Sequence, residues 1–278
     1  MKVETPAEQL FFVTVRIEGH GRDGERVGTG FLVEHQFGSD KKAQFLVTNR
    51  HVVRGAEVVR FFFLRGDGDR PLLGERDDFE VADVDKAVFF HPDAKIDVAV
   101  LPFGPLLKQM GEQGFKPFFR IVGTELIPSQ AVLDDFDALE EVVFVGYPSG
   151  IFDAKNYLPI VRRGTTATPP SIDYGGQPCF LIDAAVFPGS SGSPVFICNT
   201  GGFPSRSGFV VGTRLHLLGL ISAVLVRQDE GTLEFVAVPS VPKPRIRVSQ
   251  VLALGVVIKA RTIVETIEAC LRGAGLLK

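Results

Sequence analysis

Tryptophan is absent from the 278-residue chain, and cysteine and methionine are scarce. The three cysteines, Cys179, Cys198 and Cys270, are an odd number at irregular spacing, and no C-x-x-C pair occurs. Neither a disulfide framework nor a zinc site built on cysteine is therefore indicated. We expect buried free thiols, no metal and no cofactor.

Long apolar runs and an excess of one charge are also missing. The longest apolar stretch, residues 251–258, is strand-sized and falls well below the roughly 18 residues of a membrane-spanning helix. The 30 basic residues nearly balance the 33 acidic ones. We therefore expect neither nucleic acid nor a membrane as a partner. The N-terminus shows no secretory leader, so we expect a cytoplasmic protein.

What the sequence does contain is many short segments rich in Val, Ile, Phe and Thr, separated by turns of Gly, Pro and Asp. This pattern is typical of a mostly-β protein. The expected strands are 9–18, 27–34, 44–48, 57–64, 79–90, 97–101, 141–147, 158–166, 179–186, 194–198, 209–213, 216–226, 232–238 and 251–259. A looser stretch over about 104–140 predicts a linker between two barrels or sandwiches. Helical spacing predicts a C-terminal helix over about 260–272.

The segment F-P-G-S-S-G-S-P-V-F, residues 187–196, combines glycines and serines between two apolar strands. A glycine-bounded turn can present a serine hydroxyl and point successive backbone N–H groups into one small space. Acyl transfer needs that geometry, because the tetrahedral oxyanion requires fixed donors. The alternative is an ordinary tight loop whose hydroxyls make turn hydrogen bonds.

Two other segments supply a possible base and its partner. T-N-R-H-V-V, residues 48–53, places His51 after an apolar strand, and imidazole can accept a serine proton near neutral pH. I-D-V-A-V-L, residues 96–101, places Asp97 in an apolar strand, where a carboxylate needs a partner such as an imidazole N–H. Taken singly, His51 could be an ordinary surface histidine and Asp97 a solvent-facing residue of an edge strand.

The order His51, Asp97, Ser191 is one of the known orders of the serine peptidase triad. With these motifs, G-T-G-F-L-V at 28–33, V-G-Y-P at 145–148 and G-S-S-G-S-P-V-F at 189–196, the sequence resembles the chymotrypsin-like (trypsin-like) serine peptidases of bacterial type. The resemblance implies an all-β fold of two six-stranded antiparallel barrels followed by a helix. Residues 1–125 would carry His51 and Asp97, and residues 126–278 would carry Ser191.

The resemblance also implies roles. Ser191 would be the nucleophile, His51 the general base and then acid, and Asp97 the group that orients His51. The N–H groups of Gly189 and Ser191 would form the oxyanion hole. The substrate pocket would have Ala185 at its base and Ser222, Ala223, Val224 and Leu225 along one wall. Because no charge occurs among these pocket residues, we expect the P1 residue of the substrate, which precedes the scissile bond, to be uncharged and apolar.

The expected function is thus a metal-independent serine endopeptidase acting on a protein or peptide, with a restricted substrate. The alternative is a latent or catalytically silent homologue that binds a peptide or protein under the control of a regulatory partner. One departure bears on this choice. The animal digestive enzymes have an aspartate before the nucleophile that pairs with a newly cut N-terminus, whereas this chain has Ser190. Without that aspartate, another contact must hold the loop that carries Ser191.

Overall fold

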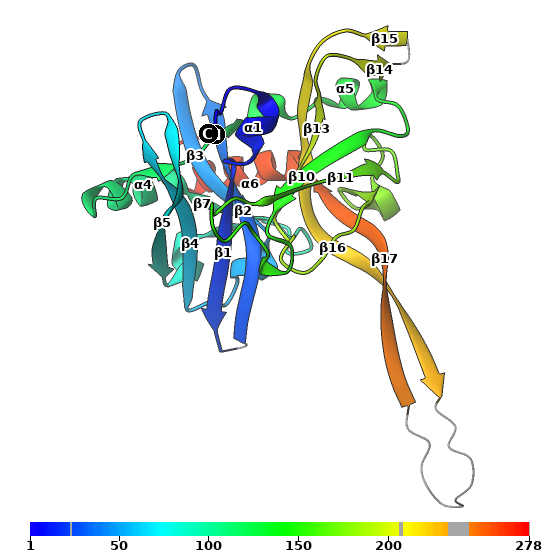
Figure 1. The fold of residues 1–278 in the computed structure, drawn as a ribbon, viewed down its shortest axis with the longest axis horizontal. Coiled ribbons are helices and arrows are strands. Elements are labelled where there is room, and N and C mark those ends of the chain that lie inside the picture. The colour runs from blue at the N-terminus through cyan, green and yellow to red at the C-terminus, as the bar shows by residue number, and fades with distance from the viewer. Residues whose placement is uncertain (23, 206–207, 233–244, 278) are drawn as a thin grey trace, which may run out of the picture.

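The computed structural model describes residues 1–22, 24–205, 208–232 and 245–277, and for residues 226–232 and 245–252 it describes the backbone only. The strands of the first half form one body and those of the second half another, with the C-terminal helix between them (Figure 1). The fold is mostly β and chymotrypsin-like, as expected. No helix among these residues is long and apolar enough to cross a membrane.

The N-terminal half is a sheet of nine strands in the order β5-β4-β1-β2-β3-β7-β6, with β8 beside β4 and β9 beside β2. The strands are β1 (Thr14–Gly21), β2 (Gly24–Phe37), β3 (Lys41–Thr48), β4 (Val58–Asp67), β5 (Arg70–Ala82), β6 (Phe89–Phe90), β7 (Ala99–Pro102), β8 (Pro117–Phe118) and β9 (Val122–Gly123). This half therefore differs in detail from the expected closed barrel of six strands. The extra strands are two-residue pairings, too short to leave an alternating pattern in the sequence.

Short helices replace two parts of the expected strands. Residues 9–18 divide into α1 (Pro6–Leu10) and β1, because Thr5 and Glu8 form a reciprocal capping box and Pro6 suits a first helical position. Residues 79–90 divide into the end of β5, α3 (Val84–Ala87) and β6. The helix α2 (Arg50–Val53) follows β3 directly.

The expected linker at 104–140 is not an unstructured connection. It contains most of α4 (Phe103–Glu112), then β8, β9, the 3₁₀ turn η1 (Thr124–Leu126) and α5 (Gln130–Asp135). The apolar face of α4 buries Phe103, Leu106 and Met110 in the N-terminal core, so this part of the stretch belongs to the first half of the molecule. The proposed boundary at 125/126 lies between β9 and β10.

The C-terminal half is a closed barrel in the order β10-β11-β12-β17-β16-β13. Its strands are β10 (Glu141–Gly146), β11 (Ile160–Thr166), β12 (Cys179–Asp183), β13 (Pro194–Asn199), β16 (Arg214–Thr232) and β17 (Arg245–Lys259). Two 3₁₀ turns, η2 (Pro148–Gly150) and η3 (Tyr174–Gly176), lie between them, and β14 (Phe203–Ser205) pairs with β15 (Gly208–Val210) in a small separate hairpin. Six strands close this barrel, as expected.

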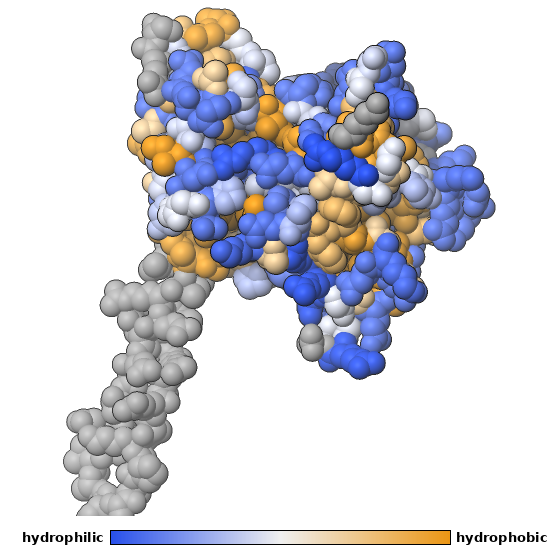
Figure 2. Space-filling model, turned by 180° about the vertical axis from the view of Figure 1, so that it is seen from behind, coloured by the Kyte–Doolittle hydropathy of each residue, from blue (hydrophilic) through white to orange (hydrophobic). Residues whose placement is uncertain are grey.

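Beyond the barrel, β16 and β17 continue as a two-stranded antiparallel ribbon (Figure 1). Strands β16 and β17 stay paired as far as Thr232 and Arg245. The described residues on both sides of this segment therefore belong to one hairpin. The strand expected at 232–238 falls almost wholly outside the described residues. At the opposite end of the barrel, Phe209 of β15 is 72% exposed and Val211, just after this strand, is 83% exposed. Figure 2 shows hydrophobic surface at this end of the molecule.

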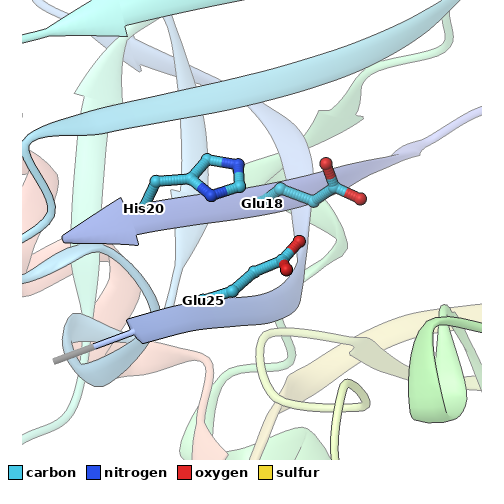
Figure 3. Close-up of side chains that lie close together, drawn as sticks. All are labelled: Glu18, His20 and Glu25. Carbon is cyan, nitrogen blue, oxygen red and sulfur yellow. The ribbon is translucent and has the colours of Figure 1, made fainter.

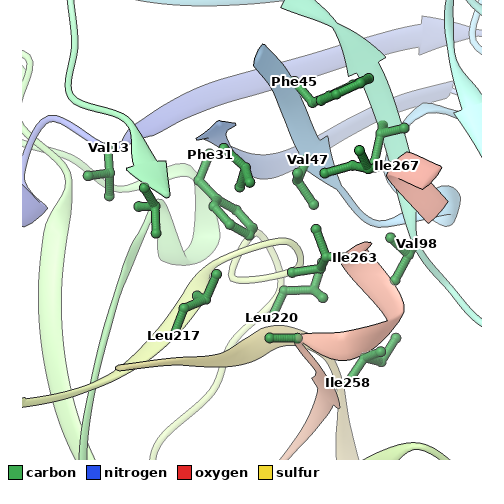
Figure 4. Close-up of a cluster of buried hydrophobic side chains, with 14 of the residues drawn as sticks. Val13, Phe31, Phe45, Val47, Val98, Leu217, Leu220, Ile258, Ile263 and Ile267 are labelled. Carbon is green, nitrogen blue, oxygen red and sulfur yellow. The ribbon is translucent and has the colours of Figure 1, made fainter. Parts of the chain in front are cut away.

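The two halves share a hydrophobic core. Phe31 and Val47 come from the N-terminal sheet, Leu217 comes from the barrel, and Ile263 and Ile267 come from α6 (Arg261–Gly273) (Figure 4). All five side chains are fully buried. The helix thus packs against both sheets, which fixes the loops at the junction where the candidate site lies. Its bounds agree with the expected 260–272 to within one residue.

Candidate functional site

The three expected catalytic residues come from loops at the junction of the two halves. His51 is the second residue of α2, and Asp97 lies two residues before β7, whereas it was expected within a strand. Ser191 belongs to the loop between β12 and β13. Asp97 leaves the strand ladder because its polar groups bond instead to the α2 segment.

The structure brings His51 and Asp97 together through two hydrogen bonds. The His51 ring donates from Nδ1 to Asp97 Oδ2 at 2.6 Å, and the His51 backbone N–H donates to Asp97 Oδ1 at 2.9 Å. Burial alone would raise the pKa of Asp97, but the hydrogen bond and charge of His51 outweigh it and hold that pKa below its ordinary 3.8. The carboxylate is therefore ionised at neutral pH and fixes which ring nitrogen of His51 carries the proton.

A third donor reaches the same carboxylate from the barrel. The Ser222 hydroxyl, on β16, lies 2.7 Å from Asp97 Oδ2 and also lowers the pKa of Asp97. Ser222 was expected only as part of the wall of the substrate pocket. Its hydroxyl joins the two halves of the molecule at the carboxylate, and sequence spacing gave no signal of this contact.

The residues just before His51 hold the loop that carries Asp97. Asn49, which is fully buried, donates from Nδ2 to the Asp97 carbonyl at 2.7 Å. Arg50 donates to the His91 carbonyl at 2.5 Å and to the Ala94 carbonyl at 3.3 Å. The T-N-R-H segment therefore positions the loop as well as supplying the histidine. The side chains of Asn49 and Arg50 had no assigned role at the sequence level.

The loop around Ser191 is fastened to β2. The Thr29 N–H donates to the Ser191 carbonyl at 2.8 Å, and the Gly192 N–H donates to the Ile221 carbonyl at 2.7 Å. Gly192 has a φ of +85°, and a Cβ there would collide with the Thr29 carbonyl. Only glycine allows the loop to approach β2 this closely.

The backbone orientation at Gly189 leaves two N–H groups free. The Pro188 carbonyl accepts the Ser149 N–H at 2.5 Å, and in a trans peptide the following N–H of Gly189 points the opposite way. Among the described residues, neither the Gly189 N–H nor the Ser191 N–H has a hydrogen-bond acceptor. Gly189 has a φ of +84°, and a Cβ there would lie 2.5 Å from the Tyr147 carbonyl oxygen, so glycine is required here too.

No hydrogen bond in the described part of the chain joins the Ser191 hydroxyl to His51. Their relative positions are set indirectly, because Thr29 bonds to the Ser191 carbonyl while the Thr48 hydroxyl, three residues before His51, donates to the Thr29 carbonyl at 2.8 Å. The structure thus joins His51 with Asp97 and Asp97 with Ser222, and it ties the Ser191 loop to the strand beside them.

The expected pocket residues occupy different surroundings. Ala185 and Ala223 are exposed, Val224 packs partly against the barrel core, and Leu225 is half-buried. None of these residues is charged, but a charged side chain lies beside them, since Nη1 of Arg162, on β11, donates to the Ala185 carbonyl. Arg162 is distant in sequence from every motif considered above, so the sequence alone gave no reason to place it here.

Glu18, His20 and Glu25 form a separate cluster on the β1–β2 hairpin (Figure 3). One donor atom from each lies within 4.8 Å of the others. Carboxylate and imidazole groups suit a divalent cation, but Glu18 is already paired with Arg16 at 2.5 Å and the other residues are more open to solvent. We therefore assign it no role in the candidate site.

The three cysteines are free, as expected. They are half-buried rather than fully buried, and burial raises the pKa of Cys179, Cys198 and Cys270. A raised pKa keeps a thiol protonated and unreactive at neutral pH.

Several solved structures are similar to this chain at low sequence identity. Similar solved structures include Rv3671c from M. tuberculosis H37Rv in an inactive form, with a TM-score of 0.45, 18% identity and coverage of 98% of this chain and 92% of that one. A serine endoprotease from Yersinia pestis has a TM-score of 0.44 and 17% identity, with 98% and 69% covered. Thermostable serine protease AL20 from an extremophilic microorganism has a TM-score of 0.47 and 15% identity, with 95% and 98% covered.

A comparison with curated proteins gives no match. The family model for the trypsin-like peptidase domain, by contrast, matches residues 28–203, which is more than half of the chain. This range includes His51, Asp97 and Ser191, the residues that the geometry above places at the junction of the two halves. The chain therefore belongs to the trypsin-like peptidase domain family.

Proposed function

We propose that this protein is a serine endopeptidase that uses His51, Asp97 and Ser191 as its catalytic triad. The observation that carries the proposal is the pair of hydrogen bonds from His51 to Asp97, at 2.6 Å and 2.9 Å. They hold the imidazole with its proton on Nδ1, which leaves Nε2 free to accept the Ser191 proton. If no acceptor faced Nδ1, the tautomer of the histidine ring would not be fixed.

In the proposed reaction, Ser191 Oγ attacks the carbonyl carbon of the scissile peptide bond while His51 Nε2 takes its proton. The resulting oxyanion accepts hydrogen bonds from the N–H groups of Gly189 and Ser191. His51 then gives the proton to the leaving amine, and an acyl-enzyme remains on Ser191. A water molecule, deprotonated by His51, hydrolyses this ester and restores the serine.

The lack of a hydrogen bond between the Ser191 hydroxyl and His51 among the described residues is compatible with this scheme. Hydrogen bonds between catalytic groups are often loose in a free enzyme and shorten when substrate binds. The hydroxyl can rotate about a single bond, whereas the loop backbone is fastened to Thr29 at 2.8 Å. The loop that carries Ser191 must be in place before substrate binds, and its backbone contact with Thr29 supports that placement.

The backbone at Gly189 favours an active enzyme over the alternative of a silent or latent homologue. In a collapsed oxyanion hole a carbonyl points into the space where the oxyanion must lie. Here the Pro188 carbonyl bonds instead to the Ser149 N–H, and within the described part of the chain the N–H groups of Gly189 and Ser191 have no hydrogen-bond acceptor. Two unused donors are costly in a structure that serves only to bind, so we place the alternative second.

The substrate is proposed to be an extended polypeptide that pairs with β16 near residues 222–225. The pairing of β16 with β17 is irregular here, shifting between Ile221 and Ala223 and again between Val224 and Val226. Strand β13 pairs with β16 only as far as Leu220. The other edge of this segment is therefore open to backbone hydrogen bonds from a peptide. An apolar P1 residue, a restricted protein target, a regulatory partner and a cytoplasmic setting remain parts of the proposal.

Labelling with a fluorophosphonate probe tests the function directly. We expect one covalent adduct by intact mass on the wild-type protein and none on Ser191→Ala. Ser39→Ala, in an exposed turn, is the matched control and should be labelled like the wild type. A wild-type protein that stays unlabelled under these conditions would contradict the proposed triad, and equal labelling of Ser191→Ala would place the nucleophile elsewhere.

A further inference from the structure

Ser190 lies between the two N–H groups assigned to the oxyanion hole, and its side chain is fully buried. Its own N–H donates to the Phe187 carbonyl at 3.0 Å, and its hydroxyl accepts Nη2 of Arg162 at 2.7 Å. Ser190 shares one planar peptide with Gly189 and another with Ser191. The Ser191 N–H lies in the peptide that Ser190 shares with Ser191, whereas the Gly189 N–H lies in the preceding Pro188–Gly189 peptide. A shift of Ser190 therefore turns the Ser191 N–H directly and reaches the Gly189 N–H through the Gly189 backbone, so the group that holds the Ser190 side chain affects both donors.

That group, the Arg162 guanidinium, also reaches the beginning of the same segment. Arg162 pairs in register with Phe144, and its guanidinium lies 4.6 Å from the Phe144 ring centre and 5.6 Å from that of Phe187. Nη1 donates to the Ala185 carbonyl, while Nη2 donates to Ser190. One planar group, anchored on a strand of the closed barrel, thus holds both ends of segment 185–190.

The segment needs such support because it lies outside the strand ladders. Strand β12 ends at Asp183 and β13 begins at Pro194. Val186 packs in the barrel core, and the Ser149 N–H donates to the Pro188 carbonyl. Among the described residues, the side-chain hydrogen bonds to this segment come from Thr29, whose hydroxyl donates to the Gly189 carbonyl at 3.1 Å from the other half of the molecule, and from Arg162 on the barrel itself.

Partly burying the charged guanidinium of Arg162 costs free energy, so the residue needs a reason beyond packing, and its hydrogen bonds to Ser190 and the Ala185 carbonyl supply one. Burial lowers its pKa, and no charged group among the described residues offsets that effect. Its acceptors are a neutral hydroxyl and a neutral carbonyl. A methionine could fill the space between two phenyl rings without the cost of burying a charge. Packing therefore does not account for arginine at this position, whereas two donors in a rigid plane do.

We propose that Arg162 is a positioning residue for the oxyanion hole, which holds Ser190 Oγ and the Ala185 carbonyl so that the N–H groups of Gly189 and Ser191 face the substrate. The inference rests on the proposed peptidase function. It provides this chain, which has Ser190 in place of an aspartate, with an internal group that orders the loop without cleavage of the N-terminus.

The test compares Arg162→Met, Arg162→Lys and Arg163→Met in the full-length chain. Arg163 is the adjacent, exposed residue of β11, so it controls for loss of a positive charge on the same strand. The readout is the rate of fluorophosphonate labelling over a range of probe concentrations. For Arg162→Met we expect the maximal rate to fall about tenfold to a hundredfold while the half-saturating concentration changes less than threefold, because the hole acts on the transition state. Lysine should recover part of the rate, since it can reach one acceptor at a time.

A second readout separates this inference from the proposed function. Amide hydrogen exchange of the peptide covering residues 185–191 should quicken in Arg162→Met but not in Arg163→Met, with thermal unfolding confirming that both variants are folded. Labelling and exchange equal to those of Arg163→Met would overturn the role of Arg162. If the wild type is not labelled, the triad proposal fails, and the exchange result alone decides whether Arg162 orders the loop. If Arg162→Met does not fold, Arg162→Lys carries the same comparison.

Discussion

Replacing Asp97 by Asn is the sharpest test of how the candidate triad works. The carboxylate accepts from the His51 ring, the His51 backbone and the Ser222 hydroxyl, so all three known contacts need an acceptor. An amide offers one oxygen. With that oxygen on the His51 backbone N–H, the NH₂ group must face Nδ1, and the imidazole must then carry its proton on Nε2.

This tautomer cannot accept the Ser191 proton, although the fold around it is nearly unchanged. The loss measured for the same exchange in the type enzyme of this family is about 10⁴ in kcat, or roughly 5.4 kcal/mol at about 1.36 kcal/mol per factor of ten. We expect a loss of that order in the rate of fluorophosphonate labelling of Asp97→Asn. Asp93→Asn, in the same loop, is the matched control, because among the described residues the Asp93 carboxylate accepts a local hydrogen bond, from the Lys95 N–H at 2.9 Å. A rate for Asp97→Asn within tenfold of the wild type would refute the tautomer argument.

Three further predictions concern the same contacts. Ser222→Ala removes a hydrogen bond to a carboxylate whose side chain is 25% exposed, so we expect labelling to slow about tenfold, roughly 1.4 kcal/mol; an unchanged rate would show that this hydroxyl is dispensable. Gly192→Ala places a Cβ against the Thr29 carbonyl at a φ of +85°, so we expect a loss of about 2–4 kcal/mol in urea unfolding and no labelling, whereas wild-type stability would contradict the close approach. The pKa of Asp97 is lowered in the folded state, so its stabilising effect is present above the ordinary value of 3.8 and is lost as the pH falls through the folded pKa. The stability difference between the wild type and Asp97→Asn should therefore shrink in urea unfolding at pH 3 relative to pH 7, and a constant difference would show that Asp97 is not linked to folding in this way.

Much of the fold could be predicted because long strands leave a local pattern. Strands such as β1 and β4 alternate buried and half-buried residues over several positions, and α6 buries residues at helical spacing. The short elements were not predictable in the same way. Strands β6, β8 and β9 have two residues each, and they exist because neighbouring strands offer pairing groups. Their formation is a property of the assembled sheet rather than of their own residues.

The candidate site divides along a similar line. His51, Asp97 and Ser191 each lie in a motif of several residues, so the sequence predicted them from composition and order. Ser222 makes one hydrogen bond to Asp97, and Arg162 makes two, to Ser190 and to the Ala185 carbonyl. These partners are distant from Ser222 and Arg162 in the sequence. A lone serine in an apolar strand or a lone arginine in a half-exposed one has many possible roles. Only the positions of their partners in three dimensions select one of them.

Thr29 shows how such single contacts set the geometry of the whole site. Its N–H donates to the Ser191 carbonyl at 2.8 Å, its hydroxyl donates to the Gly189 carbonyl at 3.1 Å and accepts the Tyr147 N–H at 3.2 Å, and its carbonyl accepts the Thr48 hydroxyl at 2.8 Å. One fully buried residue of the N-terminal sheet therefore bonds to both ends of the proposed oxyanion hole and to the strand that leads to the histidine. Because each of these bonds involves at least one backbone group, they hold the segment before the proposed base and the loop of the proposed nucleophile in register even where no direct bond joins them. The junction of the two sheets thus positions the loop that carries Ser191 relative to the strand that leads to His51.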